Sequence, residues 1–150
     1  MIPEATAIAC DLAKTFEGLR LRPYLCPAGI PTIGYGATYY IDKRPVALTD
    51  PAISKDAAER LLTVTMGNIY VAGAYSLCPT ADTPARLAAL GDFAFNLGLS
   101  RLKSSTLRKR VLDGDWTGAH TEILKWTRGG GKILPGLVRR RIAEAALLTG

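Results

Sequence analysis

The sequence predicts an α+β domain in which helices dominate and a small β lobe follows the first helix. Two observations carry this prediction. Apolar residues recur every three or four positions through most of the chain, whereas residues 24–46 are rich in proline and glycine around short β-favouring runs. The chain of 150 residues is 48% hydrophobic and 21% charged, which is ordinary for one globular domain spanning residues 1–150. A groove between the two lobes is the expected place for a polymeric ligand.

The first helix is expected over Pro3–Arg20. Its apolar stripe consists of Ala9, Leu12, Ala13, Phe16 and Leu19. Gly18 weakens the last turn, and Pro23 argues against any continuation. The β lobe should then hold two or three strands, with β-favouring runs at Thr32–Tyr35 and Thr38–Ile41.

The later helices are predicted from their start and stop signals. Their expected first or capping residues are Ser54, Pro84, Ser105, Asp115 and Pro135. The third of these helices should end near Gly114, and the fourth should carry Trp126 on its apolar side. The triple glycine Gly129–Gly131 is expected to be a flexible turn, and the last helix should run through Leu148.

Positive charge gathers in the last third of the chain. The net charge is +6, but residues 1–100 carry −1 and residues 101–150 carry +7. Such a field favours polyanionic partners such as nucleic acid, anionic lipid or bacterial envelope polymer. A solvated basic surface without a specific partner explains the same charge.

Several classes of protein are disfavoured by what the chain lacks. No apolar run is long enough to cross a bilayer, and Met1–Asp11 lacks the basic flank of a secretory signal. The cysteines Cys10, Cys26 and Cys78 form no CxxC pair, so we expect reduced thiols. His120 is the one histidine and no HExxH motif is present, so no metal or cofactor is expected.

Glu17 is the residue whose position suggests catalysis. It lies near the end of the first predicted helix, at the edge of the apolar stripe that includes Ala13 and Phe16. A partly desolvated carboxyl group keeps its proton to higher pH, which suits a general acid. For an isolated glutamate, a solvated helix end would be the simpler explanation.

The residues after Glu17 have a recognisable spacing. Cys26 follows nine residues later, and Thr32 follows after six more, where it opens the motif T-I-G-Y-G. The segment through Gly36 resembles the active-site segment of the bacteriophage-type lysozymes, the endolysin muramidases. A second block, from Phe93 onward, is similar to the helical part of the same family: F-A-F-N-L-G, S-T-L, G-D, W, G-G-K and P-G-L-V-R-R-R. The resemblance covers roughly residues 10–148 and implies a lysozyme-like fold with its active-site groove between the lobes.

The resemblance also implies roles for particular residues. Glu17 is the acid, Cys26 takes the second catalytic role as base or nucleophile, and Thr32 helps to hold the attacking water. The implied groove-lining residues are Tyr35, Phe95 and Asn96. We further expect Arg140 or Arg141 to lie near Glu17 and to hold its carboxylate in place.

Two positions depart from the commoner pattern of that family. Cys26 stands where aspartate is more usual, and Ala37 stands where many relatives carry histidine. The second change should alter only contacts at the edge of the cleft. The first touches the mechanism, because a thiol ordinarily titrates at much higher pH than a carboxyl group.

The activity implied is hydrolysis of the bond between N-acetylmuramic acid and N-acetylglucosamine in bacterial peptidoglycan, by a monomeric phage or prophage endolysin. The protein would accumulate in the host cytoplasm, and a holin-type membrane protein would then let it reach the periplasm and cell wall. Nucleic acid is not an expected partner.

Three alternatives stay open from the residues alone. A lytic transglycosylase also needs one glutamate but releases an anhydro sugar. A cysteine-type amidase would pair Cys26 with His120. A basic, helical nucleic-acid-binding module would explain the charge but not Glu17, Thr32 or the T-I-G-Y-G motif.

Overall fold

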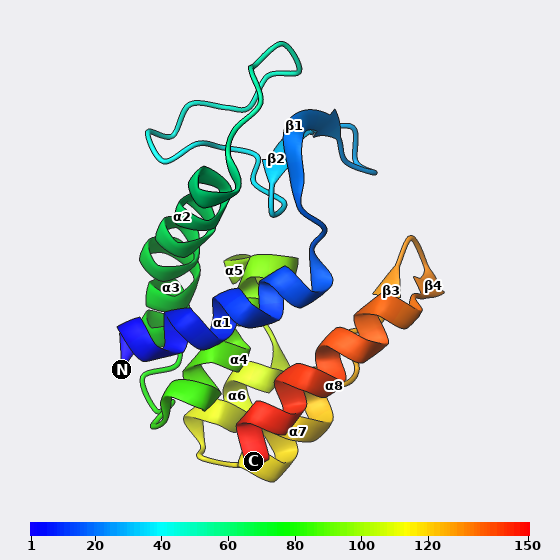
Figure 1. The fold of residues 1–150 in the computed structure, drawn as a ribbon. Coiled ribbons are helices and arrows are strands. Elements are labelled where there is room, and N and C mark those ends of the chain that lie inside the picture. Colours follow the sequence, from blue (N-terminus) through cyan, green and yellow to red (C-terminus); the bar gives the residue numbers. More distant parts are fainter.

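The computed structural model describes residues 1–150 as one helix, a small β lobe and a larger helical lobe (Figure 1). Helix α1 (Ile2–Phe16) leads into the antiparallel strands β1 (Arg20–Leu25) and β2 (Pro31–Gly34). Apart from α1, the long helices all follow the β lobe in the chain. The predicted helix-dominated α+β class is therefore confirmed.

The first helix ends earlier than the sequence suggested. Glu17 already has an extended backbone, with φ −91° and ψ 130°, and its N–H donates the last helical hydrogen bond to Ala13. The prediction of helix up to Arg20 was wrong because Arg20 starts β1, where it pairs with Gly34 of β2. Pro23 is tolerated in this strand because the register shifts between Arg20 and Tyr24, where the regular ladder is interrupted.

The second β-favouring run, Thr38–Ile41, forms no strand. It belongs to a loop held by two isolated bridges, Ile33 to Ala37 and Tyr39 to Pro45. A small separate hydrophobic cluster of Ile33, Val46 and Leu61 packs this loop and β2 against the helix that follows.

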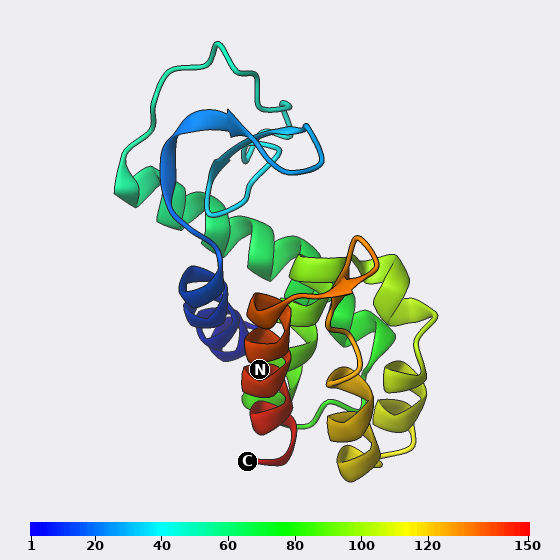
Figure 2. The same ribbon diagram turned by 90° about the vertical axis from the view of Figure 1, so that its right-hand side faces the viewer.

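That helix is a continuous but unevenly wound spine. It consists of α2 (Lys55–Thr65), a π-helical segment η1 (Met66–Val71) and α3 (Ala72–Leu77). Ser54 caps α2 as predicted, because its hydroxyl accepts from the N–H of Ala57 at 3.0 Å. No pattern in the sequence predicted the π segment. Figure 2 shows this spine running from the β lobe into the helical lobe.

The remaining elements are α4 (Pro84–Leu97), α5 (Leu99–Lys103), α6 (Thr106–Leu112), α7 (Trp116–Ile123), β3 (Arg128–Gly129), β4 (Lys132–Ile133) and α8 (Pro135–Thr149). The long helices among them begin where the sequence signals placed them, and α5 and the short strands β3 and β4 are additions. Trp126 lies beyond the end of α7, contrary to the prediction, and packs edge-on against Phe93 with ring centroids 5.4 Å apart. The triple glycine forms the turn of the β3–β4 hairpin.

Helix α4 forms the centre of the helical lobe. It packs against α1, α8 and η1, and every residue from Leu87 to Ala94 is buried. Asp92 is the one charged residue in that buried run. A carboxylate without any exposed surface requires a charged partner, and this partner connects the core to the candidate site. None of the helices combines the length and hydropathy that crossing a bilayer requires.

Candidate active site

Glu17 lies where the two lobes meet. The end of α1 presents its carboxylate from the helical lobe, and Arg140 Nη1 on α8 donates to Glu17 Oε2 at 2.5 Å. On the β-lobe side, Gly36 comes so close that a Cβ atom there would lie 3.1 Å from Glu17 Oε1. Gly36 has a positive φ of 78°, which glycine adopts without strain. The carboxylate is thus held between a guanidinium and the backbone of the T-I-G-Y-G motif, with 26% of its side chain exposed.

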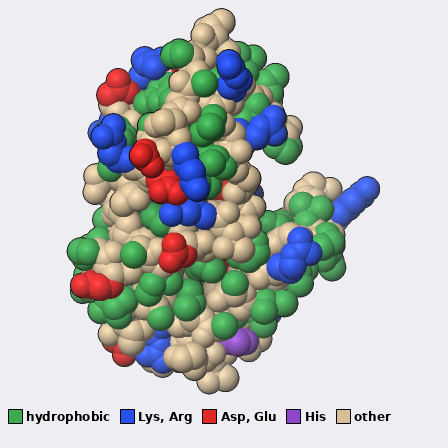
Figure 3. All heavy atoms as spheres, in the orientation of Figure 1, with side chains coloured by type: hydrophobic (Ala, Val, Ile, Leu, Met, Phe, Trp, Pro, Cys, Tyr) green, Lys and Arg blue, Asp and Glu red, His purple; other side chains and the backbone are tan.

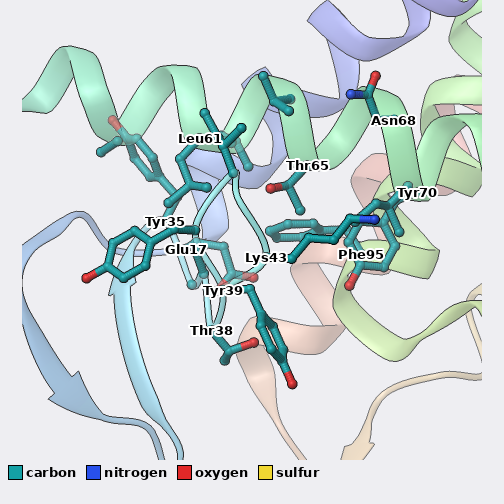
Figure 4. Close-up of a pocket in the computed structure, with 18 of the residues that line it drawn as sticks. Glu17, Tyr35, Thr38, Tyr39, Lys43, Leu61, Thr65, Asn68, Tyr70 and Phe95 are labelled. Carbon is teal, nitrogen blue, oxygen red and sulfur yellow. The ribbon is translucent and has the colours of Figure 1, made fainter. Parts of the chain in front are cut away.

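A cleft of about 570 Å³ opens on one side of Glu17 (Figure 4). The predicted groove residues Tyr35, Phe95 and Asn96 all line it. Phe95 meets Tyr70 of η1 in an edge-to-face contact, with ring centroids 5.3 Å apart. The cleft wall therefore combines aromatic surface with a few polar groups, as ligand sites commonly do.

A second hollow, about 550 Å³, opens on the other side of Glu17. It shares Glu17 and Asn96 with the first cleft and is lined further by residues at the start of α8, including Leu137 and Arg139. Figure 3 shows the surface hollowed between the β lobe and the arm that α8 and the β3–β4 hairpin form. Because the carboxylate lies at the junction of two hollows, a chain-like ligand has room on both sides of it.

Cys26 and Thr32 come together on the β1–β2 hairpin. The backbone N–H of Cys26 donates to Ile30 O at 3.1 Å, just beyond the register pair of Tyr24 and Thr32. Hydrogen bonds from the backbone lower the pKa of the Cys26 thiol, first at Ile30 and then at Ala28, and partial burial opposes them. The lowered pKa makes the thiolate more available than in an ordinary cysteine.

Thr32 is more enclosed than a water-holding residue was expected to be. Only 2% of it is exposed, and its hydroxyl donates to Ile30 O at 2.8 Å. The oxygen keeps lone pairs with which it can accept a hydrogen bond. Neither Thr32 nor Cys26 belongs to the lining of the two hollows next to Glu17.

Tyr24 lies close enough to Cys26 and Glu17 for their charges to act on its hydroxyl. Burial raises the pKa of the Tyr24 hydroxyl, and the nearby charges of Glu17 and Cys26 act in the same direction. The Arg20 guanidinium covers its ring at 4.3 Å from the centroid. Tyr24 was not predicted as a site residue, although two-residue spacing on a strand places it on the same face as Cys26.

Arg140 connects Glu17 to the core of α4. It is 3% exposed, and its Nε and Nη2 atoms donate to the two carboxylate oxygens of Asp92 at 2.9 and 2.8 Å. Burial alone would lower the pKa of Arg140, but its contacts with Asp92 and Glu17 outweigh burial and raise the pKa. The expected arginine next to Glu17 is therefore Arg140, and it stays cationic. Asp92 was missed as a site residue, although a lone aspartate in an apolar helix indicates a buried partner.

Arg141 does not contact Glu17. It is fully buried, lies 2.7 Å from Glu144 and donates to Asn96 Oδ1 at 2.7 Å. Since a guanidinium only donates, Asn96 must offer its oxygen to Arg141 and keep its NH₂ group for the cleft. Arg141 thus determines which end of the Asn96 amide a ligand meets.

His120 is held within the helical lobe by contacts of its ring with α8. Its Nδ1 lies 3.1 Å from both Ala145 O and Thr149 Oγ1 of α8, whereas Cys26 belongs to the β lobe. This arrangement gives no support to a Cys26–His120 amidase. No three His, Cys, Asp or Glu side chains group together as ligands for a metal ion would.

Comparisons with known proteins agree with this geometry. Residues 14–144 match the family described as "Phage lysozyme". The chain is 40% identical over 146 residues to the endolysin of Bacillus phage B103, which covers 93% of this chain and 52% of that protein. It is 35% identical over 140 residues to the endolysin of Acyrthosiphon pisum secondary endosymbiont phage 1, with 91% of both covered. The chain thus spans about half the length of the first relative and most of the second.

The fold agrees as well. The endolysin from Escherichia coli O157:H7 phage FAHEc1 superimposes with a TM-score of 0.84 at 32% identity, covering 95% of this chain and 90% of that one. The sequence match includes Glu17 and extends through α8 almost to its end. The lysozyme-like fold predicted from the resemblance is confirmed, and the chain belongs to the phage lysozyme family.

Proposed function

We propose that this chain is an endolysin muramidase, which hydrolyses the β-1,4 bond between N-acetylmuramic acid and N-acetylglucosamine in bacterial peptidoglycan. The observation that carries the proposal is the position of Glu17, a carboxylate at the junction of two hollows and between the lobes of a phage lysozyme fold. Residues 1–150 act as a single catalytic domain. The endolysins among its relatives support this activity over nucleic-acid binding.

Glu17 is the general acid of the proposed reaction. With the glycan lying across both hollows, the protonated carboxyl group gives its proton to the oxygen that leaves with the neighbouring sugar. Arg140 keeps the side chain pointing at that oxygen through its hydrogen bond, and the bidentate contact with Asp92 fixes Arg140 in turn. The acid is therefore positioned by the core of the helical lobe.

Cys26 supplies the second group, with Thr32 beside it. In one route the thiolate takes a proton from a water molecule, whose oxygen bonds to the anomeric carbon while Glu17 protonates the leaving oxygen. In the other, the sulfur itself bonds to that carbon and water later displaces it. The lowered pKa of the Cys26 thiol supports both routes. Thr32 accepts a hydrogen bond from the water in either case.

Substrate contacts are proposed for the residues that line the cleft. Tyr35 and Phe95 provide surface against which a sugar ring packs. The NH₂ group of Asn96, which Arg141 turns toward the cleft, donates to a carbonyl or hydroxyl oxygen of the glycan. The protein works as a monomer on the cell wall, and a holin-type membrane protein gives it access from the host cytoplasm.

A wall-clearing assay on the Glu17→Gln variant tests the proposal. Loss of the acid should slow clearing about 10²- to 10⁴-fold, which is the usual contribution of general acid catalysis. The unmodified protein and a sample with alkylated thiols are run beside it. Mass spectrometry of the digest should show products that contain an added water. Anhydro sugars would instead identify a lytic transglycosylase, and full activity of Glu17→Gln would refute the assignment of the acid.

A further inference from the structure

The loop after β2 lines the cleft, and it holds one residue in an unusual backbone conformation. Lys43 has φ 69° and is the one non-glycine residue with positive φ in the chain. Its N–H donates to Tyr40 O at 2.9 Å, and the N–H of Tyr40 donates to Arg44 O at 3.0 Å, so a tight turn fixes Lys43 in place. A left-handed conformation at a residue other than glycine costs free energy and tends to persist at functional sites.

Arg44, the other cation of this loop, already has a carboxylate partner. Arg44 Nη1 lies 3.2 Å from Asp50 Oδ1, and Asp50 also accepts from the Tyr40 hydroxyl at 2.8 Å. Asp42 accepts from the backbone N–H of Arg44 at 3.0 Å. Lys43, by contrast, takes part in none of the ion pairs of the chain. It is therefore the one cation of the loop without an ion-pair partner.

Lys43 directs this charge into the cleft. Figure 4 shows its side chain reaching across the cleft toward Tyr70 and Phe95. Glu17 and Lys43 are the two charged residues among those that line the cleft. Glu17 is paired with the Arg140 guanidinium of the helical lobe, so the ammonium of Lys43 is left for a ligand.

We propose that Lys43 binds a carboxylate carried by the glycan and thereby makes the cleft selective for glycan that bears acidic substituents. This inference rests on the proposed muramidase function and adds a determinant of specificity to it. Peptidoglycan offers such carboxylates in two places: on the peptides attached to muramic acid, and on the lactyl group itself once its peptide has been removed. An ammonium at the end of a flexible stem suits either, because it makes no demand for a planar, bidentate partner.

The test compares Lys43→Met with the unmodified protein on three soluble glycans. These are peptide-bearing strands, the same strands with their carboxylates converted to amides, and strands from which an amidase has removed the peptides. Lys43→Met should raise KM on the peptide-bearing strands about two- to fivefold at low salt, as expected for a partly exposed ion pair. Its effect on carboxyl-amidated strands should be clearly smaller. Lys43→Arg should restore the low KM.

The third glycan distinguishes the two sources of the carboxylate. A KM effect that persists on amidase-treated strands assigns it to the lactyl group, whereas its disappearance assigns it to the peptide. Lys132→Met is the matched control, because it removes the same charge from β4, outside the cleft lining. An equal rise in KM on peptide-bearing and amidated strands, or for Lys132→Met as for Lys43→Met, would overturn the inference. If the unmodified protein cut none of the glycans, the proposed function itself would fail.

Discussion

Replacing Arg140 by methionine is expected to weaken the fold as well as the site. Arg140 is 3% exposed and satisfies both oxygens of Asp92, which has no exposed surface, as well as one oxygen of Glu17. Methionine has a comparable reach but no charge. The variant therefore removes both guanidinium hydrogen bonds of the fully buried Asp92 carboxylate.

The size of the effect follows from that burial. Removing one partner of a buried ion pair costs about 3–5 kcal/mol, out of a total stability of about 5–15 kcal/mol. In a domain of this length each kcal/mol changes Tm by about 2–4 °C. Arg140→Met should thus lower Tm by about 6–20 °C.

Thermal unfolding followed by circular dichroism measures this change. Arg139→Met is the control, because Arg139 is the exposed neighbour on α8 and its loss should cost less than about 0.5 kcal/mol. Adding Asp92→Asn to Arg140→Met removes the stranded charge and should recover part of the lost stability. A Tm within about 2 °C of the unmodified protein, or a double variant no more stable than Arg140→Met, would refute this reasoning.

Two further predictions concern the catalytic groups. Gly36→Ala places a Cβ 3.1 Å from Glu17 Oε1, and the displaced acid should slow hydrolysis about ten- to hundredfold. Gly114→Ala is the control, because Gly114 has a similar positive φ but open space around it. This control should cost only about 1–2 kcal/mol of stability. Equal losses of rate in the two variants, compared at the same fraction of folded protein, would contradict this prediction. Because the pKa of Cys26 is lowered and its active form is the thiolate, the rate should rise with pH through a midpoint below that of ordinary cysteine. Cys26→Asp should move this rise to acid pH, and an unchanged pH–rate profile would show that position 26 does not titrate in the rate-limiting step.

The helical lobe was predictable because its signals are local. Ser54 and Asp115 cap their helices through hydrogen bonds to residues three positions on, and Pro84 and Pro135 stand at first helical positions. The end of α1 was not predictable in the same way. Leu19 continues the apolar pattern, but pairing of Arg20 with Gly34, a tertiary contact, decides the backbone there.

The same distinction between local signals and tertiary contacts applies to the candidate site. Spacing within one segment predicted Glu17, Cys26 and Thr32 as candidate catalytic residues, and the last helix was expected to bring an arginine to Glu17. Which arginine does so depends on contacts over long sequence separations, 123 residues for Glu17 and 48 residues for Asp92. The orientation of the Asn96 amide and the isolation of Lys43 depend on partners that no local pattern specifies.

The π segment η1 has a consequence for how this chain tolerates insertions and deletions. A π turn holds one residue more than an α turn, and η1 supplies Asn68, Ile69 and Tyr70 to the cleft. Deleting a single residue there would restore even winding and leave α3 at nearly the same rotation relative to α2, because the π turn already takes up the extra residue. The same deletion within α2, where no turn holds a surplus residue, would rotate everything after it by about 100° and turn the apolar side of α3 away from α4. The spine can thus lose a residue at η1 at little cost to its packing, and the residues lost would come from the wall of the cleft.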